Sequence, residues 1–224
     1  MCGRYTFFAK KENIEFKIKN INSFDFKEDY NISPGREIRG IIKKGNNYYL
    51  QKFIWGMLPN KNNFNNNFNK SSSKYFIINS RKESLLDIYY DSFKNFRCVI
   101  LASGFYEWRI EGSKKTPYYF KFNNNKIIYF AGIYKIREDG FPTCSIITVE
   151  SNDKIKNIHD RIPAILDYNH AKIWLDENND DILLNILKPV NNLEFYEVNR
   201  NVGNTVFNSV ETILPFKNDY KLFE

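Results

Sequence analysis

The chain has 224 residues, of which 42% are hydrophobic, including 20 Phe and 15 Tyr, so it can bury the core of one large domain. It contains no uncharged apolar run of about 18 residues and no apolar secretory leader, and we therefore expect neither membrane insertion nor export. Three cysteines without a C-x-x-C pair and only two histidines predict no disulfide and no metal site. The net charge of +7 favours polyanionic partners.

Strand patterns dominate the middle of the chain. Two β-rich runs flank Gly45-Asn46-Asn47, which is typical of a hairpin turn. Strands are expected over residues 37–43, 48–55, 97–102, 105–109, 117–122, 126–136 and 143–149.

Helical patterns are fewer. The spacing of Ile14, Ile18 and Ile21 predicts a helix near the start of the chain. Further helices are expected over residues 83–93, 169–175 behind an Asn cap, and 180–187 before Pro189.

These elements predict an α+β fold in which a curved antiparallel sheet or barrel-like core carries a few peripheral helices. The polar stretch 60–73 has no long apolar period, which favours a mobile loop over a domain linker. No repeat of fixed period is present. We therefore expect one domain over residues 1–224 and a monomer.

Cys2 directly follows the initiator Met, and its small side chain permits removal of Met1. The mature terminus would then carry an α-amine and a thiol on adjacent carbons, with pKa values near ~8 and ~8.5. This pair suits an aldehyde, because the amine can form an imine and the thiol can then close a five-membered thiazolidine. The alternative is a small residue at a frayed terminus.

Three further places concentrate polar groups in apolar surroundings. Asn79 and Arg81 follow the apolar run 75–78 where a helix start is expected, a junction that can bind a phosphate or a sugar oxygen or serve only as a cap. Glu107 lies between aromatic residues that can raise its pKa into the range useful for proton transfer, unless it points to solvent. His159 precedes an apolar segment and suits a proton shuttle near pH 7, although a lone His is more often structural.

Taken together, these motifs resemble the SRAP family, the SOS-response-associated peptidase-like proteins. The resemblance is carried by an ordered set of segments along the chain. They are Met1 to Tyr5, Tyr30 to Pro34, Trp55 to Pro59, Asn79 to Glu83, Arg97 to Trp108, Ala131 to Tyr134, Ile146 to Thr148 and Ile158 to Pro163.

The resemblance implies covalent capture and protection of abasic sites in single-stranded DNA through a thiazolidine on Cys2. In that scheme Asn79 holds the sugar, while Glu107 and His159 move protons. The implied DNA contacts are Arg4, Asn31, Trp55, Arg81 and Arg161. No cofactor is implied, lyase-like or autoproteolytic activity could accompany capture, and the replication machinery is a further partner to consider.

Two departures from the family pattern and two alternative functions remain open at this stage. An Asn-rich loop follows Trp55-Gly56-Met57-Leu58-Pro59 where the family has another Trp, and residues 199–210 match the closing segment only loosely. One alternative is a thiol peptidase that acts on its own N-terminus or on a peptide. The other is a non-covalent single-strand-binding module that stacks bases on Trp55 and Phe105. We expect a cytoplasmic, nucleoid-associated protein in a bacterium, or a nuclear one in a eukaryote.

Overall fold

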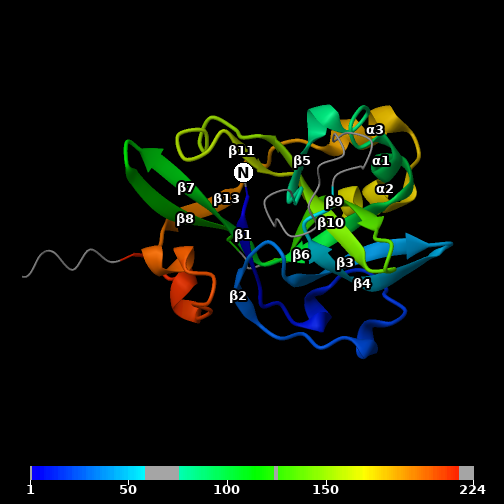
Figure 1. The fold of residues 1–224 in the computed structure, drawn as a ribbon, viewed down its shortest axis with the longest axis horizontal. Coiled ribbons are helices and arrows are strands. Elements are labelled where there is room, and N and C mark those ends of the chain that lie inside the picture. Colours follow the sequence, from blue (N-terminus) through cyan, green and yellow to red (C-terminus); the bar gives the residue numbers. More distant parts are fainter. Residues whose placement is uncertain (1, 59–75, 124–125, 217–224) are drawn as a thin grey trace, which may run out of the picture.

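Five strands close into a barrel in the computed structural model, which describes residues 2–58, 76–123 and 126–216 (Figure 1). In ring order, β10 pairs with β4, β4 with β3, β3 with β6, β6 with β9, and β9 again with β10. Only the β10–β4 pairing is parallel. The barrel strands are β3 (Glu37–Lys44), β4 (Asn47–Trp55), β6 (Arg97–Ala102), β9 (Ile128–Ile136) and β10 (Pro142–Glu150).

Three short strands extend this barrel along β10 and β9. β5 (Asn79–Arg81) runs parallel to β10, and β11 (Arg161–Pro163) runs antiparallel to the end of the same strand. β12 (Ile165–Leu166) pairs with β9. β5 and β11 are far apart in the sequence, and both lie against β10.

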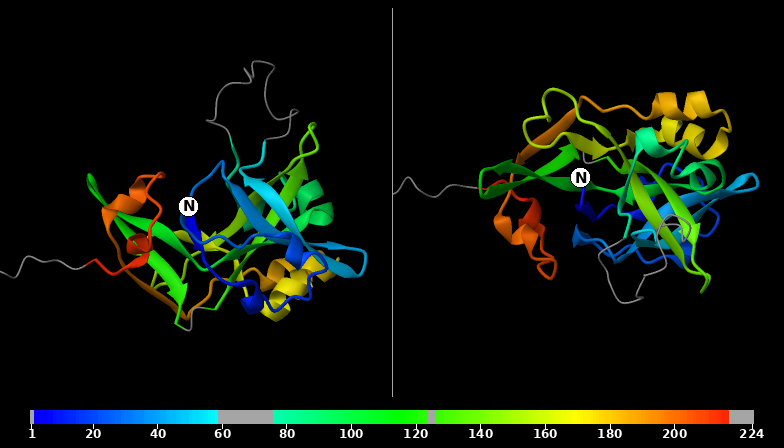
Figure 2. Two further views of the ribbon diagram at one scale, coloured as in Figure 1. Left: turned by 90° about the horizontal axis from the view of Figure 1, so that it is seen from below. Right: turned by 45° about the horizontal axis from the view of Figure 1, so that its top comes forward.

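The other five strands form a separate antiparallel sheet with the order β13–β8–β7–β1–β2. They are β1 (Arg4–Phe7), β2 (Asp29–Ile32), β7 (Gly104–Glu111), β8 (Lys114–Phe122) and β13 (Leu193–Glu197). Tyr5 of β1 and Phe105 of β7 both pack edge-on against Phe130 of the barrel, at 5.9 and 6.0 Å between ring centroids. The two sheets thus share one apolar core as a single domain. Figure 1 and both views of Figure 2 show β1 starting between them.

Gly104, the first residue of β7, allows the close approach of its neighbours. A Cβ atom at this position would lie 2.2 Å from the Tyr119 hydroxyl and 2.6 Å from the Phe120 carbonyl oxygen. Any larger residue would push β7 away from β8. Because Glu107 lies on the same strand, this glycine helps to set its position.

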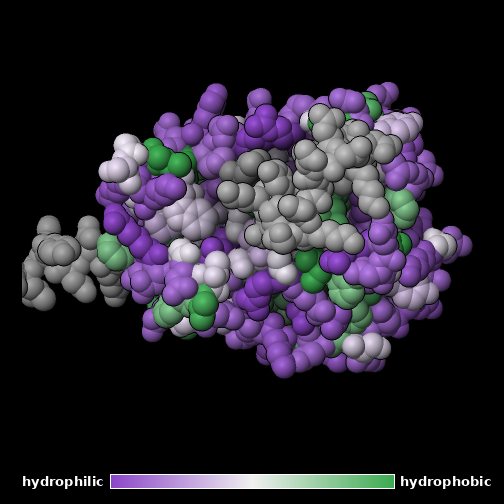
Figure 3. Space-filling model, in the orientation of Figure 1, coloured by the Kyte–Doolittle hydropathy of each residue, from purple (hydrophilic) through white to green (hydrophobic). Residues whose placement is uncertain are grey.

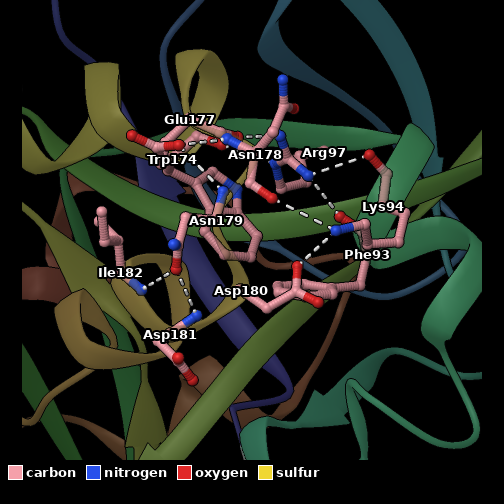
Figure 4. A network of polar contacts seen from close by, with 10 residues as sticks. All are labelled: Phe93, Lys94, Arg97, Trp174, Glu177, Asn178, Asn179, Asp180, Asp181 and Ile182. Carbon is pink, nitrogen blue, oxygen red and sulfur yellow. Dashed lines mark hydrogen bonds and ion pairs between the residues drawn. The ribbon is translucent and has the colours of Figure 1, made fainter.

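Three helices cover one end of the barrel: α1 (Tyr90–Asn95), α2 (Tyr168–Asp176) and α3 (Asp180–Ile186). Arg97 of β6 donates hydrogen bonds to the carbonyl oxygens of Phe93, Lys94, Trp174 and Glu177, which lie at the ends of α1 and α2 (Figure 4). Trp174 is fully buried and donates its indole N–H to the Cys98 carbonyl. A single guanidinium therefore joins two helices to the barrel.

Short 3₁₀ turns complete the described chain. They are η1 (Lys11–Asn13), η2 (Ile21–Ser23), η5 (Lys82–Ser84), η6 (Arg200–Gly203) and η7 (Val210–Ile213). The expected α+β fold with a barrel-like core and few helices is confirmed. The predicted hairpin at residues 37–55, the five later strand runs and the helices beginning near 169 and 180 are also present.

Other expected elements are wrong or displaced. Residues 13–19 alternate between exposed and buried, with Ile14, Phe16 and Ile18 inside, so this segment is extended and not helical. The period-two signal included Phe16, whereas the helical interpretation used only the isoleucines. The helix expected over 83–93 is reduced to η5 and α1, and Asp167, not Asn169, caps α2. The loop expected at 60–73 lies outside the described residues.

The face shown in Figure 3 is largely hydrophilic, with apolar residues in small groups. Within the described ranges, no helix is long and apolar enough to cross a membrane. In the same part of the chain, no cluster of three His, Cys, Asp or Glu side chains is arranged to hold a metal ion.

Candidate active site

The start of β1 places Cys2 among the residues expected to do chemistry. Cys2 is fully buried, and its Sγ donates a weak hydrogen bond to the Arg4 carbonyl oxygen at 3.6 Å. Burial raises the pKa of the thiol, and the nearby Glu107 carboxylate raises it further. The sulfur is therefore a protonated thiol at neutral pH and needs a proton acceptor before it can act as a nucleophile.

Asn79, at the start of β5, holds the backbone of Cys2. Its Nδ2 donates to the Cys2 carbonyl oxygen at 2.8 Å. Its Oδ1 is buried and has no hydrogen-bond partner among the described residues. Because a buried acceptor without a donor is costly, this oxygen is suited to a hydroxyl or amine that enters the site.

Glu107 approaches the same site from β7. Its side chain is only 2% exposed, so the expectation of a buried carboxylate among aromatics is met and the solvent-facing alternative is not. The register of β1 on β7, with Arg4 opposite Tyr106, brings the residue after Tyr106 next to the N-terminal end of β1. Burial raises the pKa of Glu107 to about 8. The carboxyl group is therefore largely protonated at pH 7.

His159 reaches this site from the loop before β11. Its Nε2 lies 3.8 Å from Glu107 Oε2. Its Nδ1 accepts the backbone N–H of Arg161 at 3.0 Å and also lies 2.9 Å from Asp160 Oδ1, whereas Nε2 faces Glu107. Burial lowers the pKa of His159 below its usual range. At pH 7 the pair therefore consists of a neutral imidazole and a carboxylic acid.

The structure thus brings the four expected catalytic residues, Cys2, Asn79, Glu107 and His159, together from β1, β5, β7 and the loop before β11. Their convergence depends on pairings that the sequence does not display. β5 reaches the site because it lies beside β10, and His159 reaches it because β11 pairs with the end of the same strand.

The residues expected to touch DNA are mostly interior. Arg4 is 8% exposed, and its Nη1 donates to Asn31 Oδ1 at 2.7 Å and to the Val202 carbonyl oxygen. Asn31, fully buried, donates to the carbonyl oxygens of Val202, Asn204 and Phe207. Together they join β1 and β2 to the segment after β13.

Trp55 and Arg161 are also engaged inside the protein. Trp55 is fully buried, packs edge-on against Tyr5 and donates its indole N–H to the Ile78 carbonyl oxygen, so its ring face is not available to a base. Phe105 is buried as well. Arg161 is 6% exposed and donates to the Thr148 carbonyl oxygen at 2.7 Å and to Glu83 Oε2 at 2.9 Å. Of the five residues expected to contact DNA, Arg81 alone is exposed.

Sequence reasoning missed the groups that hold these residues. Glu83 and Thr148 fix the guanidinium of Arg161, and through its backbone Arg161 fixes the ring of His159. Both lie inside segments already singled out, Asn79 to Glu83 and Ile146 to Thr148. The Val202 carbonyl oxygen that accepts a hydrogen bond from Arg4 is a backbone atom, so no residue type in the sequence marks it.

Comparison with known proteins places this geometry in a family. The family model "SOS response associated peptidase (SRAP)" matches residues 1–205. The chain belongs to the SRAP family. Over 228 residues this SRAP chain is 33% identical to "Abasic site processing protein YoaM" of Bacillus subtilis, covering 95% of this chain and 97% of the relative. It is 32% identical over 190 residues to "Abasic site processing protein HMCES" of Xenopus tropicalis, covering 72% of this chain and 56% of that protein.

Solved structures show the same SRAP fold. A protein from Bacteroides thetaiotaomicron superimposes with a TM-score of 0.70 at 22% identity, over 89% of this chain and 93% of that one. A phage-related protein from Bordetella bronchiseptica gives a TM-score of 0.68 at 25% identity, over 89% of this chain and 95% of the other.

Proposed function

We propose that this protein processes abasic sites in DNA by capturing their aldehyde on Cys2 as a thiazolidine. The observation that carries the proposal is the convergence of Cys2, Asn79, Glu107 and His159 in one buried site. The names of the relatives, abasic site processing proteins, supply the substrate class. Single-stranded DNA is the form whose ring-opened sugar can reach a site of this kind.

The reaction begins after removal of Met1, which converts the Cys2 nitrogen from an amide into an amine. The amine adds to the aldehyde carbon, so a C–N bond forms, the C=O π bond breaks, and a proton of the amine passes to the oxygen to give a carbinolamine. Glu107, protonated at neutral pH because burial raises its pKa to about 8, donates a proton to the departing hydroxyl, and water leaves. The product is a protonated imine on Cys2.

The thiol then closes the ring. Sγ forms a bond to the imine carbon, the C–N double bond becomes single, and the nitrogen keeps the electron pair. The thiol proton passes to the Glu107 carboxylate, directly or through His159, whose Nε2 faces that carboxyl group. The sum is loss of one water with no change of oxidation state. Asn79 keeps the Cys2 backbone in place and offers Oδ1 to a hydroxyl of the opened sugar.

The interior positions of Trp55 and Phe105 disfavour the non-covalent module that would stack bases on these two rings. A base can stack only on an accessible ring face, and both rings are fully buried. The arrangement therefore supports chemistry at Cys2 over simple strand binding.

The test is intact-mass spectrometry of the mature protein mixed with a single-stranded oligonucleotide that carries one abasic site. Wild type should gain the mass of the oligonucleotide minus one water and keep it through denaturation. Cys2→Ser should lose the heat-stable adduct, since a hydroxyl does not close a stable ring, yet borohydride should still trap its imine. A full-strength, heat-stable adduct in Cys2→Ser would overturn the proposal, as would a normal adduct on a chain that retains Met1.

A further inference from the structure

A cleft of about 440 Å³ opens on the surface beside the candidate site. One wall is η5 and the residues that follow it, a second is the end of β10, and the third is the end of α3 with the segment after it. This last segment runs across the molecule from α3 toward β13 (Figures 1 and 2). The volume of the cleft is in the range typical of small-ligand sites.

Two lysines line this cleft. Lys82 comes from η5 and Lys188 from the segment after α3. Burial lowers the pKa of Lys82, the Glu83 carboxylate opposes this shift, and the positive charge of Lys188 adds to it, so both groups lie near Lys82. In the parts of the chain that the structure describes, no ion pair is formed by either lysine.

The cleft also carries two carboxylates, Glu83 and Glu150. Glu83 is bound to Arg161 at 2.9 Å and also lies near Lys82, so one carboxylate is shared between two cations. Glu150 remains, at an exposed position on the rim. Three cations, Lys82, Lys188 and Arg161, against these two carboxylates leave a net positive charge, which favours an anionic group such as a phosphate.

The rest of the cleft is apolar and held in shape. Leu86 is 48% exposed on one side, and Leu184 and Pro189 lie on the other. The segment after α3 is fastened by two hydrogen bonds, from Lys82 Nζ to the Leu187 carbonyl oxygen at 2.9 Å and from Asn152 Nδ2 to the Val190 carbonyl oxygen at 2.7 Å. An apolar wall beside two cations matches a nucleotide, which has a flat apolar base and a charged phosphate.

The cleft is linked to the candidate active site through neighbouring residues of the chain and through hydrogen bonds. Lys82 directly follows the exposed Arg81, and Asn79 begins the same strand. On the other side, Glu83 holds Arg161, whose backbone N–H holds His159. A single strand that places an abasic sugar at Cys2 could therefore extend past Arg81 into the cleft.

We propose that this cleft is a second subsite, which binds the phosphate and base of a nucleotide flanking the abasic site in single-stranded DNA. The proposal rests on the proposed function, because the abasic nucleotide fixes where the strand begins. Lys188 and Lys82 hold the phosphate, and Leu86 with Leu184 contacts the base.

The experiment measures binding without covalent chemistry. Oligonucleotides carry a tetrahydrofuran abasic analogue, which has no aldehyde, and are extended by one or by six nucleotides on the 5′ side, or likewise on the 3′ side. The dissociation constant is measured by fluorescence anisotropy for wild type, Lys188→Ala, Lys188→Glu and Leu86→Ala. Lys44→Ala, at the exposed tip of the β3–β4 hairpin, is the matched charge control.

Extension on one side should improve the affinity of the wild type. Lys188→Ala should reduce the long-to-short affinity ratio by at least about threefold, and Lys188→Glu should reduce it further. The salt slope of the long oligonucleotide should fall by about ~0.7 in Lys188→Ala and stay constant in Leu86→Ala, whose loss is apolar. Lys44→Ala should change neither the long-to-short affinity ratio nor the salt slope.

The proposal is overturned if the long-to-short affinity ratio is the same in wild type and both Lys188 variants, or if Lys44→Ala reduces it equally. Capture of true abasic DNA by the wild type is measured in parallel. Its presence with an unchanged ratio refutes the second subsite alone, whereas its absence refutes the proposed function.

Discussion

Asn79 Nδ2 donates a hydrogen bond to the carbonyl oxygen of Cys2 at 2.8 Å and so ties the proposed nucleophile to β5. The bond joins two residues 77 positions apart, and it lies at the end of β1, where the strand ladder no longer supports the chain. The position of the reacting amine and thiol therefore depends on a side chain from a different sheet.

Asn79→Ala should slow aldehyde capture by about 10²-fold, because a displacement of the reacting group on the order of 1 Å costs that much. The nucleophile itself is intact in this variant, so the final adduct should still form. Single-turnover time courses with abasic DNA measure the rate. A wild-type rate would show that neither the hydrogen bond to Cys2 nor Oδ1 contributes to capture.

Arg81 should contribute to DNA binding through a phosphate, since it is the one exposed guanidinium among the predicted contacts. Arg81→Ala is expected to reduce the slope of log affinity against log salt for undamaged single strands by about ~0.7. Arg137→Ala, in the exposed β9–β10 turn, is the control and should leave the slope unchanged. Equal slopes for wild type and Arg81→Ala would place the phosphate contacts elsewhere.

Asn31 should matter for stability more than for DNA contact. Its Nδ2 donates to the carbonyl oxygens of Val202, Asn204 and Phe207, and its Oδ1 accepts from Arg4. Asn31→Ala removes all of these hydrogen bonds and leaves Arg4 Nη1 only its bond to the Val202 carbonyl. We expect the free energy of unfolding to fall by about 2 to 4 kcal/mol. Denaturant titration measures the loss, and hydrogen exchange should rise at residues 199–207.

Asn31→Asp distinguishes the acceptor role of the Asn31 side chain from its donor role. It keeps an oxygen for Arg4 but removes the donor and places a charge beside three carbonyl oxygens, so it should be no more stable than Asn31→Ala. A stability change below about 0.5 kcal/mol in both variants, the range of ordinary surface substitutions, would contradict the assigned role.

The sequence allowed most strands to be predicted and the four residues of the proposed site to be singled out, because local patterns carry that information. Alternation marks a strand wherever it lies, and Glu107 among aromatics is unusual on inspection alone. The burial of Trp55 and Arg161 was not predictable in this way. Whether an aromatic or a guanidinium faces solvent depends on what covers it, here Tyr5 for Trp55, and Thr148 with Glu83 for Arg161.

The strand pairings that close the barrel were the other feature that local patterns could not predict. The strand run at 143–149 suggested one more antiparallel neighbour, yet β10 pairs in parallel with β4 and β5 as well as antiparallel with β9. Parallel pairing requires a long crossover, and no short turn in the sequence signals it. The β10–β5 pairing brings Asn79 to Cys2, and the β10–β11 pairing brings His159 there.

Glu107→Gln should change how stability depends on pH. The pKa of Glu107 is about 8 in the folded state and near its ordinary value of 4.5 when unfolded, so between these values the native state binds more protons. The free energy of unfolding of the wild type therefore falls as pH rises from about 4.5 to 8, by up to a few kcal/mol at about 1.4 kcal/mol per pKa unit. Gln has no proton to lose, so the variant should be more stable relative to wild type at pH 9 than at pH 4.5. Urea titrations at both pH values decide it, and parallel pH profiles would contradict a buried, neutral Glu107.

The capture rate should depend on both members of the pair formed by Glu107 and His159. Burial raises the pKa of Glu107 to about 8 and lowers that of His159, so near pH 7 the carboxyl group can donate a proton and the imidazole can accept one. Above about pH 8 the acid ionises, and the wild-type rate of water loss should decline. Glu107→Gln should be slower by about 10² to 10⁴ at pH 7 and should lack this decline.

His159→Ala should be slower at pH 7 and should retain the decline above pH 8, because Glu107 is unchanged. The Cys2 amine also titrates in this range, but every variant keeps it, so the difference between profiles reports on the pair. Rates of adduct formation are measured from pH 6 to 9.5 by rapid quench, with affinity for the tetrahydrofuran analogue as the control for binding. If both variants capture at the wild-type rate throughout, the two residues support the fold and the proton-transfer assignment is wrong.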